Sequence, residues 1–177
     1  MFADPEKILK QIGIQDNMIV ADLGAGSGFY SILAAQMASN GKVYAVEIQK
    51  DFLTTIKNKA NDAHLNNLET IWGDVEQVGG TKLKDEIIDR VIASNVLFQI
   101  VNKQKFIDEA FRILKPEGKI LLIDWTDAME VLRPKKEVII NKEQAREMFE
   151  KKGFVYERDI DAGMHHYGMI LKKVVNA

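Results

Sequence analysis

A glycine-rich stretch near the N-terminus, "DLGAGSG", has the composition of a ligand-binding turn. It places Gly24, Gly26 and Gly28 at every second position behind Asp22. Glycine lets the backbone approach a ligand closely and adopt conformations that side chains disfavour. The dinucleotide spacing G-x-G-x-x-G fails because Phe29 stands where the third glycine is needed, and no Gly-Lys-Ser/Thr follows to make a phosphate-binding loop.

Two further acids follow apolar runs downstream of this turn. Glu47 ends "KVYAVE" and Asp74 follows "LETIWG". In a doubly wound α/β sheet, an acid at the end of the second strand can accept hydrogen bonds from the hydroxyls of a ribose. A further carboxylate can accept a hydrogen bond from an amino group. Together with Asp22, these acids favour a ligand with a sugar, an amine and positive charge over a pyrophosphate.

The elements that must position these residues alternate along the chain. Apolar runs too short for helices predict strands at residues 18–23, 42–48, 68–74, 88–96 and 119–125. Segments with helical periodicity lie between most of them, starting with a helix over 4–13 that Asp4 caps and Gly13 ends. Strands that alternate with helices predict a doubly wound α/β sheet, covered by helices on both faces.

The helix expected over residues 29–39 has large apolar side chains at helical spacing. Phe29, Ile32, Leu33 and Met37 share one face, which predicts that this face packs on the core. The dipeptide at residues 40–41, Asn-Gly, predicts a left-handed stop after the helix.

The C-terminal part of the chain departs from this alternation. After a helix with the capping pair Asn141 and Gln144, two strand-like runs at 154–160 and 165–174 are separated only by "DAGM". That link allows a hairpin but no crossover, so the last strand is expected to be antiparallel. The predicted fold is a Rossmann-like, doubly wound, seven-stranded sheet that is mostly parallel, in a single domain over residues 1–177.

Composition excludes several classes of function. The chain of 177 residues carries 24 Lys and Arg against 26 Asp and Glu, so no net positive charge attracts nucleic acid. The absence of cysteine excludes disulfides, thiolate metal sites and cysteine nucleophiles, and no metal site is expected. No signal peptide and no apolar run near the roughly 18 residues of a membrane span are found, so a cytoplasmic location is expected.

At these motifs the chain resembles the class I S-adenosylmethionine-dependent methyltransferases. The matching features are the D/E-x-G-x-G-x-G turn, the acid that ends the second strand, Gly73-Asp74 after the third, "SNVLFQI" after the fourth, and "RILKPEGKILLID" into the fifth. The terminal antiparallel hairpin is also that family's sheet signature. In detail the chain is similar to the small ubiquinone/menaquinone-biosynthesis-like branch.

The resemblance implies S-adenosylmethionine as cofactor and assigns its binding to residues at four strand ends. The methionine end would be held by Asp22, Gly24, Ala25, Gly26 and Gly28. The ribose, the adenine amine and the ring faces would be held by Glu47, Ile48, Gly73, Asp74 and Val75. Ser94 and Asn95 would line the crevice, although a plain turn before a helix explains them as well.

The expected reaction is methyl transfer to an unidentified small molecule. "SNVL" differs from the Pro-Pro-aromatic motif of enzymes that methylate planar amides and base amino groups, and without cysteine the thiol relay of arsenic methylation is absent. Two alternatives stay open: a non-catalytic S-adenosylmethionine-binding module that acts with a partner, and a nicotinamide-dependent oxidoreductase. A homodimer is a further possibility.

A catalytic base is predicted at "MHHYG", residues 164–168. The last strand should open here, beside the strand end at Asp124, and a histidine with a carboxylate at one rim could act as a base and its orienting group. Because strand residues alternate in direction, only one of His165 and His166 can face the pocket, and His166 is favoured. The alternative is that both histidines bond loop backbone.

The irregular stretch at residues 124–138 is predicted to cover the acceptor as a lid. Arg133, Lys135 and Lys136 would then form an anion clamp, or simply an exposed basic loop.

Overall fold

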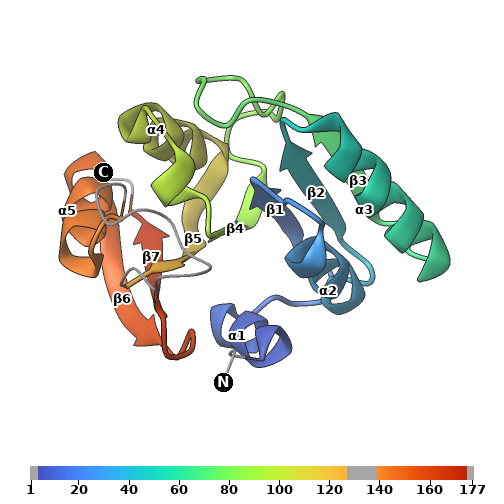
Figure 1. Cartoon of the computed structure of the whole chain (residues 1–177), viewed down its shortest axis with the longest axis horizontal. Helices are drawn as coiled ribbons and strands as arrows, with labels where there is room; N and C mark the ends of the chain where they lie inside the picture. The colour runs from blue at the N-terminus through green and yellow to red at the C-terminus, as the bar shows by residue number, and fades with distance from the viewer. Residues whose placement is uncertain (1–3, 127–138, 175–177) are drawn as a thin grey trace.

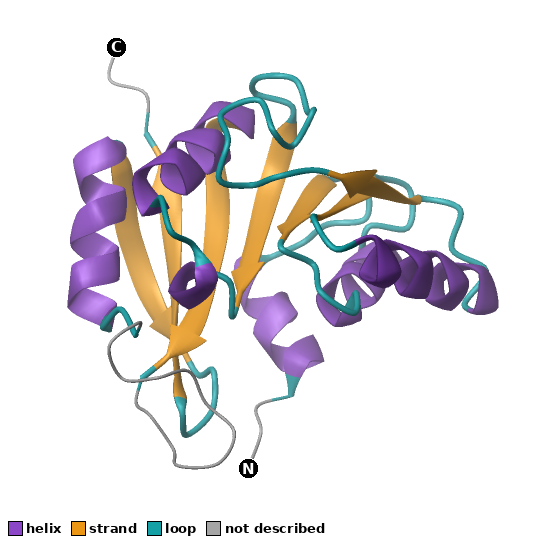
Figure 2. Ribbon diagram, turned by 45° about the horizontal axis from the view of Figure 1, so that its top comes forward, coloured by secondary structure: helices purple, strands orange, loops and turns teal. Residues whose placement is uncertain are grey.

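The computed structural model describes residues 4–126 and 139–174, which form one seven-stranded sheet with helices packed on both faces (Figures 1 and 2). In chain order the elements are α1 (Pro5–Ile12), β1 (Ile19–Leu23), α2 (Phe29–Met37), β2 (Lys42–Glu47), α3 (Lys50–Asp62), β3 (Leu68–Trp72), β4 (Ile88–Ser94), the short 3₁₀ helix η1 (Leu97–Gln99), α4 (Lys103–Ile113), β5 (Leu114–Trp125), α5 (Lys142–Lys152), β6 (Phe154–Ile160) and β7 (His166–Lys173). Most of the predicted lid, with Arg133, Lys135 and Lys136, lies outside the described residues. No helix in the described ranges is long and apolar enough to cross a membrane.

The sheet has the strand order β3-β2-β1-β4-β5-β7-β6. The pairs from β3 to β5 are parallel, whereas β7 is antiparallel to both β5 and β6. The predicted fold is therefore confirmed, including the antiparallel last strand. The short link between β6 and β7 cannot hold a crossover, so β7 must return beside β6, and it does so between β6 and β5.

Two apolar clusters hold the layers together. On one face, Phe106 and Ile107 of α4 and Phe149 of α5 are fully buried against the sheet. On the other face, Leu9 of α1 and Ala34 of α2 are fully buried. Burial on both faces explains why the central strands read as continuous apolar runs.

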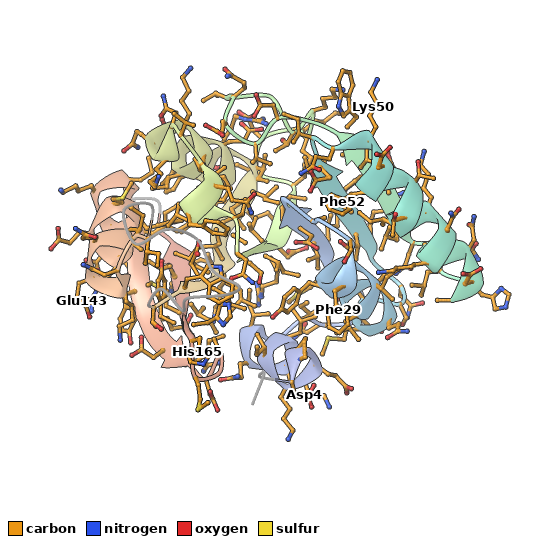
Figure 3. All side chains as sticks on the ribbon, viewed as in Figure 1. Asp4, Phe29, Lys50, Phe52, Glu143 and His165 are labelled. Carbon is orange, nitrogen blue, oxygen red and sulfur yellow. The ribbon has the colours of Figure 1, made fainter. Side chains whose placement is uncertain are left out.

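The buried face of α2 differs from the predicted one. Ser31, Ala34 and Ala35 face the core, whereas Phe29 is 55% exposed (Figure 3). The periodicity of the large side chains was therefore a poor guide to the buried face of this helix. The small residues face inward instead, and small side chains let the helix backbone approach the sheet closely.

The predicted left-handed stop after α2 is wrong. The helix ends at Met37, and Gly41 is absent from the residues with positive φ. A Cβ at Gly41 would lie 1.9 Å from the carbonyl oxygen of Met18, so glycine is needed there for close backbone approach.

The segment 73–87, between β3 and β4, is anchored by a buried carboxylate on α4. Glu109 is fully buried and accepts hydrogen bonds from the Gly79 amide at 2.6 Å and the Thr81 hydroxyl at 2.5 Å. Arg112 Nη2 donates to the same carboxylate at 2.7 Å. This network fixes the segment whose first residues form one wall of the candidate site.

Candidate functional site

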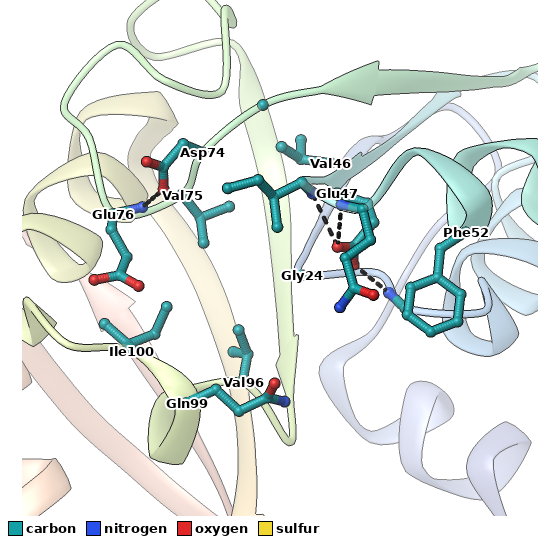
Figure 4. Close-up of a pocket in the computed structure, with 14 residues that line it drawn as sticks. Gly24, Val46, Glu47, Phe52, Asp74, Val75, Glu76, Val96, Gln99 and Ile100 are labelled. Atoms are coloured by element: carbon teal, nitrogen blue, oxygen red, sulfur yellow. Dashed lines mark hydrogen bonds between the residues drawn. The ribbon is translucent and has the colours of Figure 1, made fainter.

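A pocket of about 240 Å³ lies at the carboxyl ends of β1, β2 and β3 (Figure 4). The predicted residues that line it are Gly24, Gly26, Glu47, Ile48, Gly73, Asp74 and Val75. Lining residues that the sequence reasoning missed are Val46, Gln49, Phe52, Glu76, Val96, Gln99 and Ile100. We call this the glycine-turn pocket.

The glycine turn is bonded to the end of β2. The amides of Gly24 and Ala25 both donate to the Val46 carbonyl, at 2.9 and 3.1 Å. Gly26 has a φ of 52°, and a Cβ built on it would meet no atom within 4 Å. Because Gly26 lines the pocket, its bare backbone faces open space that a ligand can approach.

Gly28 has a packing role at the start of α2, and its predicted contact with the cofactor stays a prediction. It caps α2 with a φ of 80°, and a Cβ there would lie 2.5 Å from Cγ1 of Ile56 on α3. Gly28 is absent from the pocket lining, as is Ala25. The third glycine therefore serves the close packing of α2 against α3.

Glu47 connects the end of β2 to the glycine turn. Its Oε2 accepts from the Gly26 amide at 2.8 Å, and its Oε1 accepts from the amides of Ile48 and Gln49, both at 2.9 Å (Figure 4). The residue is only 5% exposed. The side chain thus sets the position of the turn as well as lining the pocket.

Asp22 lies outside the pocket lining, at the buried end of β1. It is 3% exposed, and the Ser31 hydroxyl donates to its Oδ2 at 2.5 Å. Burial raises the pKa of Asp22 to about 6, the hydrogen bond from Ser31 opposes this shift, and the charge of Glu47 adds to it. Its predicted contact with the methionine end of a cofactor stays a prediction.

Three carboxylates give the pocket a negative character. Besides Glu47, Asp74 lines it and accepts from the Glu76 amide at 2.9 Å, and Glu76 accepts from the amides of Val101 and Asn102. No lysine or arginine stands among the described residues that line it. A cationic or amine-bearing ligand suits these walls, and an anionic one does not.

The missed residues come mostly from segments that fold back over the strand ends. Gln99 is the last residue of η1, Ile100 follows it, and Phe52 belongs to the first turn of α3 (Figures 3 and 4). Nothing in their local sequence distinguishes them from core residues. Glu76 alone carried a signal, because it is an acid two residues after Asp74.

Ser94 and Asn95, predicted to line the crevice, do not line the glycine-turn pocket. Asn95 has a φ of 55°, and its amide donates to the Ile123 carbonyl at 2.8 Å. It thus begins the turn that carries Val96 to the pocket wall, while its own side chain lies at the end of β4.

The predicted pair of His166 and Asp124 is not brought together. In the register of β5 and β7, His166 pairs with Trp125 and Asp124 pairs with Tyr167. Paired residues share a face and successive residues alternate, so His166 and Asp124 point to opposite faces of the sheet. His166 stacks on Trp125 at 4.2 Å between ring centroids, and the residue beside Asp124 is Tyr167.

Asp124 is a buried carboxylate held in place by backbone amides. It is 1% exposed and accepts from the amides of Phe98 and Trp125, at 3.1 and 2.8 Å. Burial raises its pKa to about 6 against the opposing effect of these amides. The bond to Phe98 also holds η1, whose last residue lines the glycine-turn pocket.

Solved structures resemble this chain over nearly its whole length. A SAM-dependent methyltransferase from Aquifex aeolicus matches with a TM-score of 0.87 and 28% identity, covering 98% of this chain and 90% of that one. A putative type 11 methyltransferase from Sulfolobus solfataricus matches with a TM-score of 0.79 and 25% identity, covering 99% and 95%.

Curated relatives share a shorter part. A demethylmenaquinone methyltransferase of Oceanobacillus iheyensis is 26% identical over 117 residues, which are 66% of this chain and 48% of that protein. An arsenite methyltransferase of Halobacterium salinarum is 29% identical over 106 residues, or 59% and 26%. The match thus spans about half or less of these two relatives.

The family model described as a methyltransferase domain matches residues 14–165. This range runs from the loop before β1, through the glycine turn and the acids, to the residue before β7, and so contains every residue that lines the glycine-turn pocket. The chain therefore belongs to the methyltransferase domain family, with the Rossmann-like fold of class I S-adenosylmethionine-dependent methyltransferases.

Proposed function

We propose that the protein is an S-adenosylmethionine-dependent methyltransferase that acts on a small molecule. The observation that carries this proposal is the glycine-turn pocket, with Glu47, Asp74 and Glu76 in its walls and no cation among its described lining residues. Such walls attract a sulfonium and an amine and repel the pyrophosphate of a nicotinamide cofactor. This charge favours methyl transfer over the oxidoreductase alternative.

The residues present fit the proposed cofactor. A carboxylate has about four lone-pair sites, and the Glu47 carboxylate uses three for backbone amides. One site remains to accept from a ribose hydroxyl. Asp74 binds the Glu76 amide through Oδ1, so its Oδ2 can accept from the adenine amine. The open side of Gly26 would lie against the cofactor, and Ile48 and Val75 would flank the adenine ring.

S-adenosylmethionine supplies a methyl group already activated by a positively charged sulfur. The work left to this chain is to bind both reactants, align them and exclude water. Alignment alone can contribute about 7–11 kcal/mol to such a displacement. The turn at Gly24–Gly26 and the wall at residues 73–76 would provide this fixed alignment, because the amides of Gly24 and Gly73 are bonded to the Val46 and Glu47 carbonyls at the end of β2.

Several observations favour a small-molecule acceptor. Two of the relatives, a demethylmenaquinone methyltransferase and an arsenite methyltransferase, are named for small acceptors. A net charge of −2 gives no attraction for nucleic acid, and the lack of cysteine disfavours thiol-dependent arsenite handling. The lack of cysteine also suits the cytoplasm, which we propose as the location. The homodimer stays a prediction that light scattering would check.

Titration calorimetry with S-adenosylhomocysteine, NAD and the wild-type protein tests the proposed cofactor. We expect saturable binding of S-adenosylhomocysteine and none of NAD. Glu47→Gln puts an amide NH₂ against backbone donors and removes the charge, so affinity should fall about ten- to hundredfold. The matched control is Glu69→Gln, which removes an acid that forms an exposed ion pair with Lys42. This variant should bind S-adenosylhomocysteine as wild type does.

Two results would contradict the proposal: binding of NAD without S-adenosylhomocysteine, or equal affinity in wild type and Glu47→Gln. The non-catalytic alternative is separated by a second measurement. Transfer of a labelled methyl group in a screen of small acceptors is expected from an enzyme, whereas tight cofactor binding without any transfer would favour a binding module.

A further inference from the structure

Three polar residues follow one another along one edge of the sheet, at the carboxyl ends of β4 and β5 and the amino end of the antiparallel β7. Ser94 pairs with Ile123, so Asn95 comes level with Asp124, and Asp124 pairs in turn with Tyr167. Asn95 is bonded to this edge through its amide, which donates to Ile123. We call Asn95, Asp124 and Tyr167 the edge row.

Two members of the edge row have hydrogen-bonding atoms without a partner among the residues that the structure describes. The Tyr167 hydroxyl and the Asn95 Oδ1 are both buried and unbonded, and Tyr167 as a whole is 6% exposed. Buried polar side chains nearly always have a partner, so each exception calls for an explanation. The two atoms complement each other, because a hydroxyl donates and an amide oxygen accepts.

The electrostatics of the edge row support these roles. With a pKa raised to about 6 by burial, Asp124 is ionised at neutral pH and can accept. Burial, and then the charge of Asp124, raise the pKa of Tyr167, so its hydroxyl keeps its proton and can donate. The row thus presents a donor beside two acceptors.

The edge row lies between two pockets. Val96, next to Asn95, lines the glycine-turn pocket. Tyr167 and His166 both line a second pocket of about 410 Å³, which also includes Thr126, Ile160 and the N-terminus of α5. Lys142 and Asp159 in this second pocket pair with each other at 2.8 Å. Glu143 adds a negative charge, so the second pocket suits a neutral ligand better than an anion.

We propose that the second pocket binds the methyl acceptor, that this acceptor carries a hydroxyl group on a neutral body, and that Tyr167 is its binding residue. The acceptor oxygen takes the hydrogen bond of the Tyr167 hydroxyl, and the acceptor hydroxyl donates to an oxygen of Asp124 or Asn95. This inference rests on the proposed methyltransferase function and deepens it. His166 lines the same pocket, but Tyr167 and not His166 is the residue paired with Asp124.

The test compares 1-naphthol with naphthalene, which share a body that a pocket of 410 Å³ can hold and differ by one hydroxyl. Binding is measured by fluorescence with and without saturating S-adenosylhomocysteine. The variant is Tyr167→Phe, which removes only the hydroxyl and keeps the ring in the core. Tyr44→Phe on β2, on the far side of β1 from this edge, is the matched control.

We expect Tyr167→Phe to weaken 1-naphthol binding about three- to tenfold, the effect of one neutral hydrogen bond. Naphthalene and S-adenosylhomocysteine should bind as in wild type, and Tyr44→Phe should change nothing. Equal 1-naphthol affinities in wild type and Tyr167→Phe, or no 1-naphthol binding by wild type, would overturn the inference. Failure of wild type to bind S-adenosylhomocysteine would overturn the proposed function instead. In that case, binding of 1-naphthol that depends on Tyr167 would still support a site for a hydroxyl-bearing ligand in the second pocket.

Discussion

Two carboxylates near the glycine turn, Glu47 and Asp22, have different surroundings and therefore different roles. Glu47 is bonded to three backbone amides beside an open pocket, whereas Asp22 is buried with one hydroxyl donor. Burial destabilises the charged form of a carboxylate, and at Asp22 the hydrogen bonds from Ser31 oppose this effect only in part. We therefore expect the protonation of Asp22 to make the stability of the protein depend on pH.

The pKa of Asp22, raised from 3.8 to about 6, predicts a pH-dependent stability. Between these pH values the folded protein keeps a proton that the unfolded chain releases, so the free energy of unfolding falls as the pH rises from 4 to 6. At 1.36 kcal/mol per pKa unit the full effect is about 3 kcal/mol. Part of it falls below pH 4, so wild type should lose about 2 kcal/mol more than Asp22→Asn over this range.

Urea denaturation at pH 4.5 and at pH 7 measures this difference. Asp62→Asn, at the exposed end of α3, is the control and should follow the wild-type profile. Parallel profiles for wild type and Asp22→Asn would show that the buried carboxyl does not titrate in this range.

At the scale of elements, the strand-to-helix turn after β1 divides its glycines between two tasks. Gly26 faces the pocket, and Gly28 packs against Ile56 where α2 meets α3. The segment after β3 is positioned in another way, through the buried Glu109 on α4. In both cases, contacts that lie outside the pocket fix the position of a segment that lines it.

Alanine substitution should separate the two glycine roles. Gly26→Ala has room for its Cβ but a φ of 52°, so it should cost about 1–2 kcal/mol of stability and weaken S-adenosylhomocysteine binding. Gly28→Ala combines a φ of 80° with a 2.5 Å contact to Ile56, and overpacking should add about 1–3 kcal/mol. Denaturation and calorimetry on both variants check this, and equal stability losses would contradict the assignment.

Glu109→Gln should loosen the segment at residues 73–87. The substitution places an NH₂ group among the donors of Gly79, Thr81 and Arg112, and breaking a buried pair of this kind costs about 3–5 kcal/mol. Cofactor affinity should fall too, because Asp74 and Glu76 belong to that segment.

The control for this prediction is Glu150→Gln, which breaks the exposed pair with Arg146 and should cost less than about 1 kcal/mol. If Glu109→Gln and Glu150→Gln prove equally stable, the anchoring role is wrong.

For the whole molecule, the parallel strands bring the glycine turn, Glu47 and Asp74 to one edge of the sheet although they are far apart in sequence. A ligand at this edge contacts loops after three strands, so its binding should stabilise the entire fold. S-adenosylhomocysteine at 100 times its dissociation constant should raise the free energy of unfolding by about 2.7 kcal/mol.

Thermal unfolding with and without the ligand measures this stabilisation. NAD at the same concentration is the control and should leave the melting temperature unchanged. A melting temperature that rises with NAD but not with S-adenosylhomocysteine would favour the oxidoreductase alternative.

The sequence by itself determined the features that depend on neighbouring residues. Glycines at alternate positions predicted the turn, acids after apolar runs predicted part of the pocket wall, and the short link before β7 allowed only an antiparallel return. These are local constraints of conformation and chain length, and they hold whatever the rest of the chain does.

Only the tertiary structure decided which side chains meet. The register of β7 against β5 put Tyr167 beside Asp124 and turned His166 to the other face. The folding of η1 over the strand ends brought Gln99 to the pocket. A shift of one residue in register reverses every side chain of a strand, and no local pattern in β7 specifies that register. It is set instead by packing against both neighbouring strands and the helices that cover them.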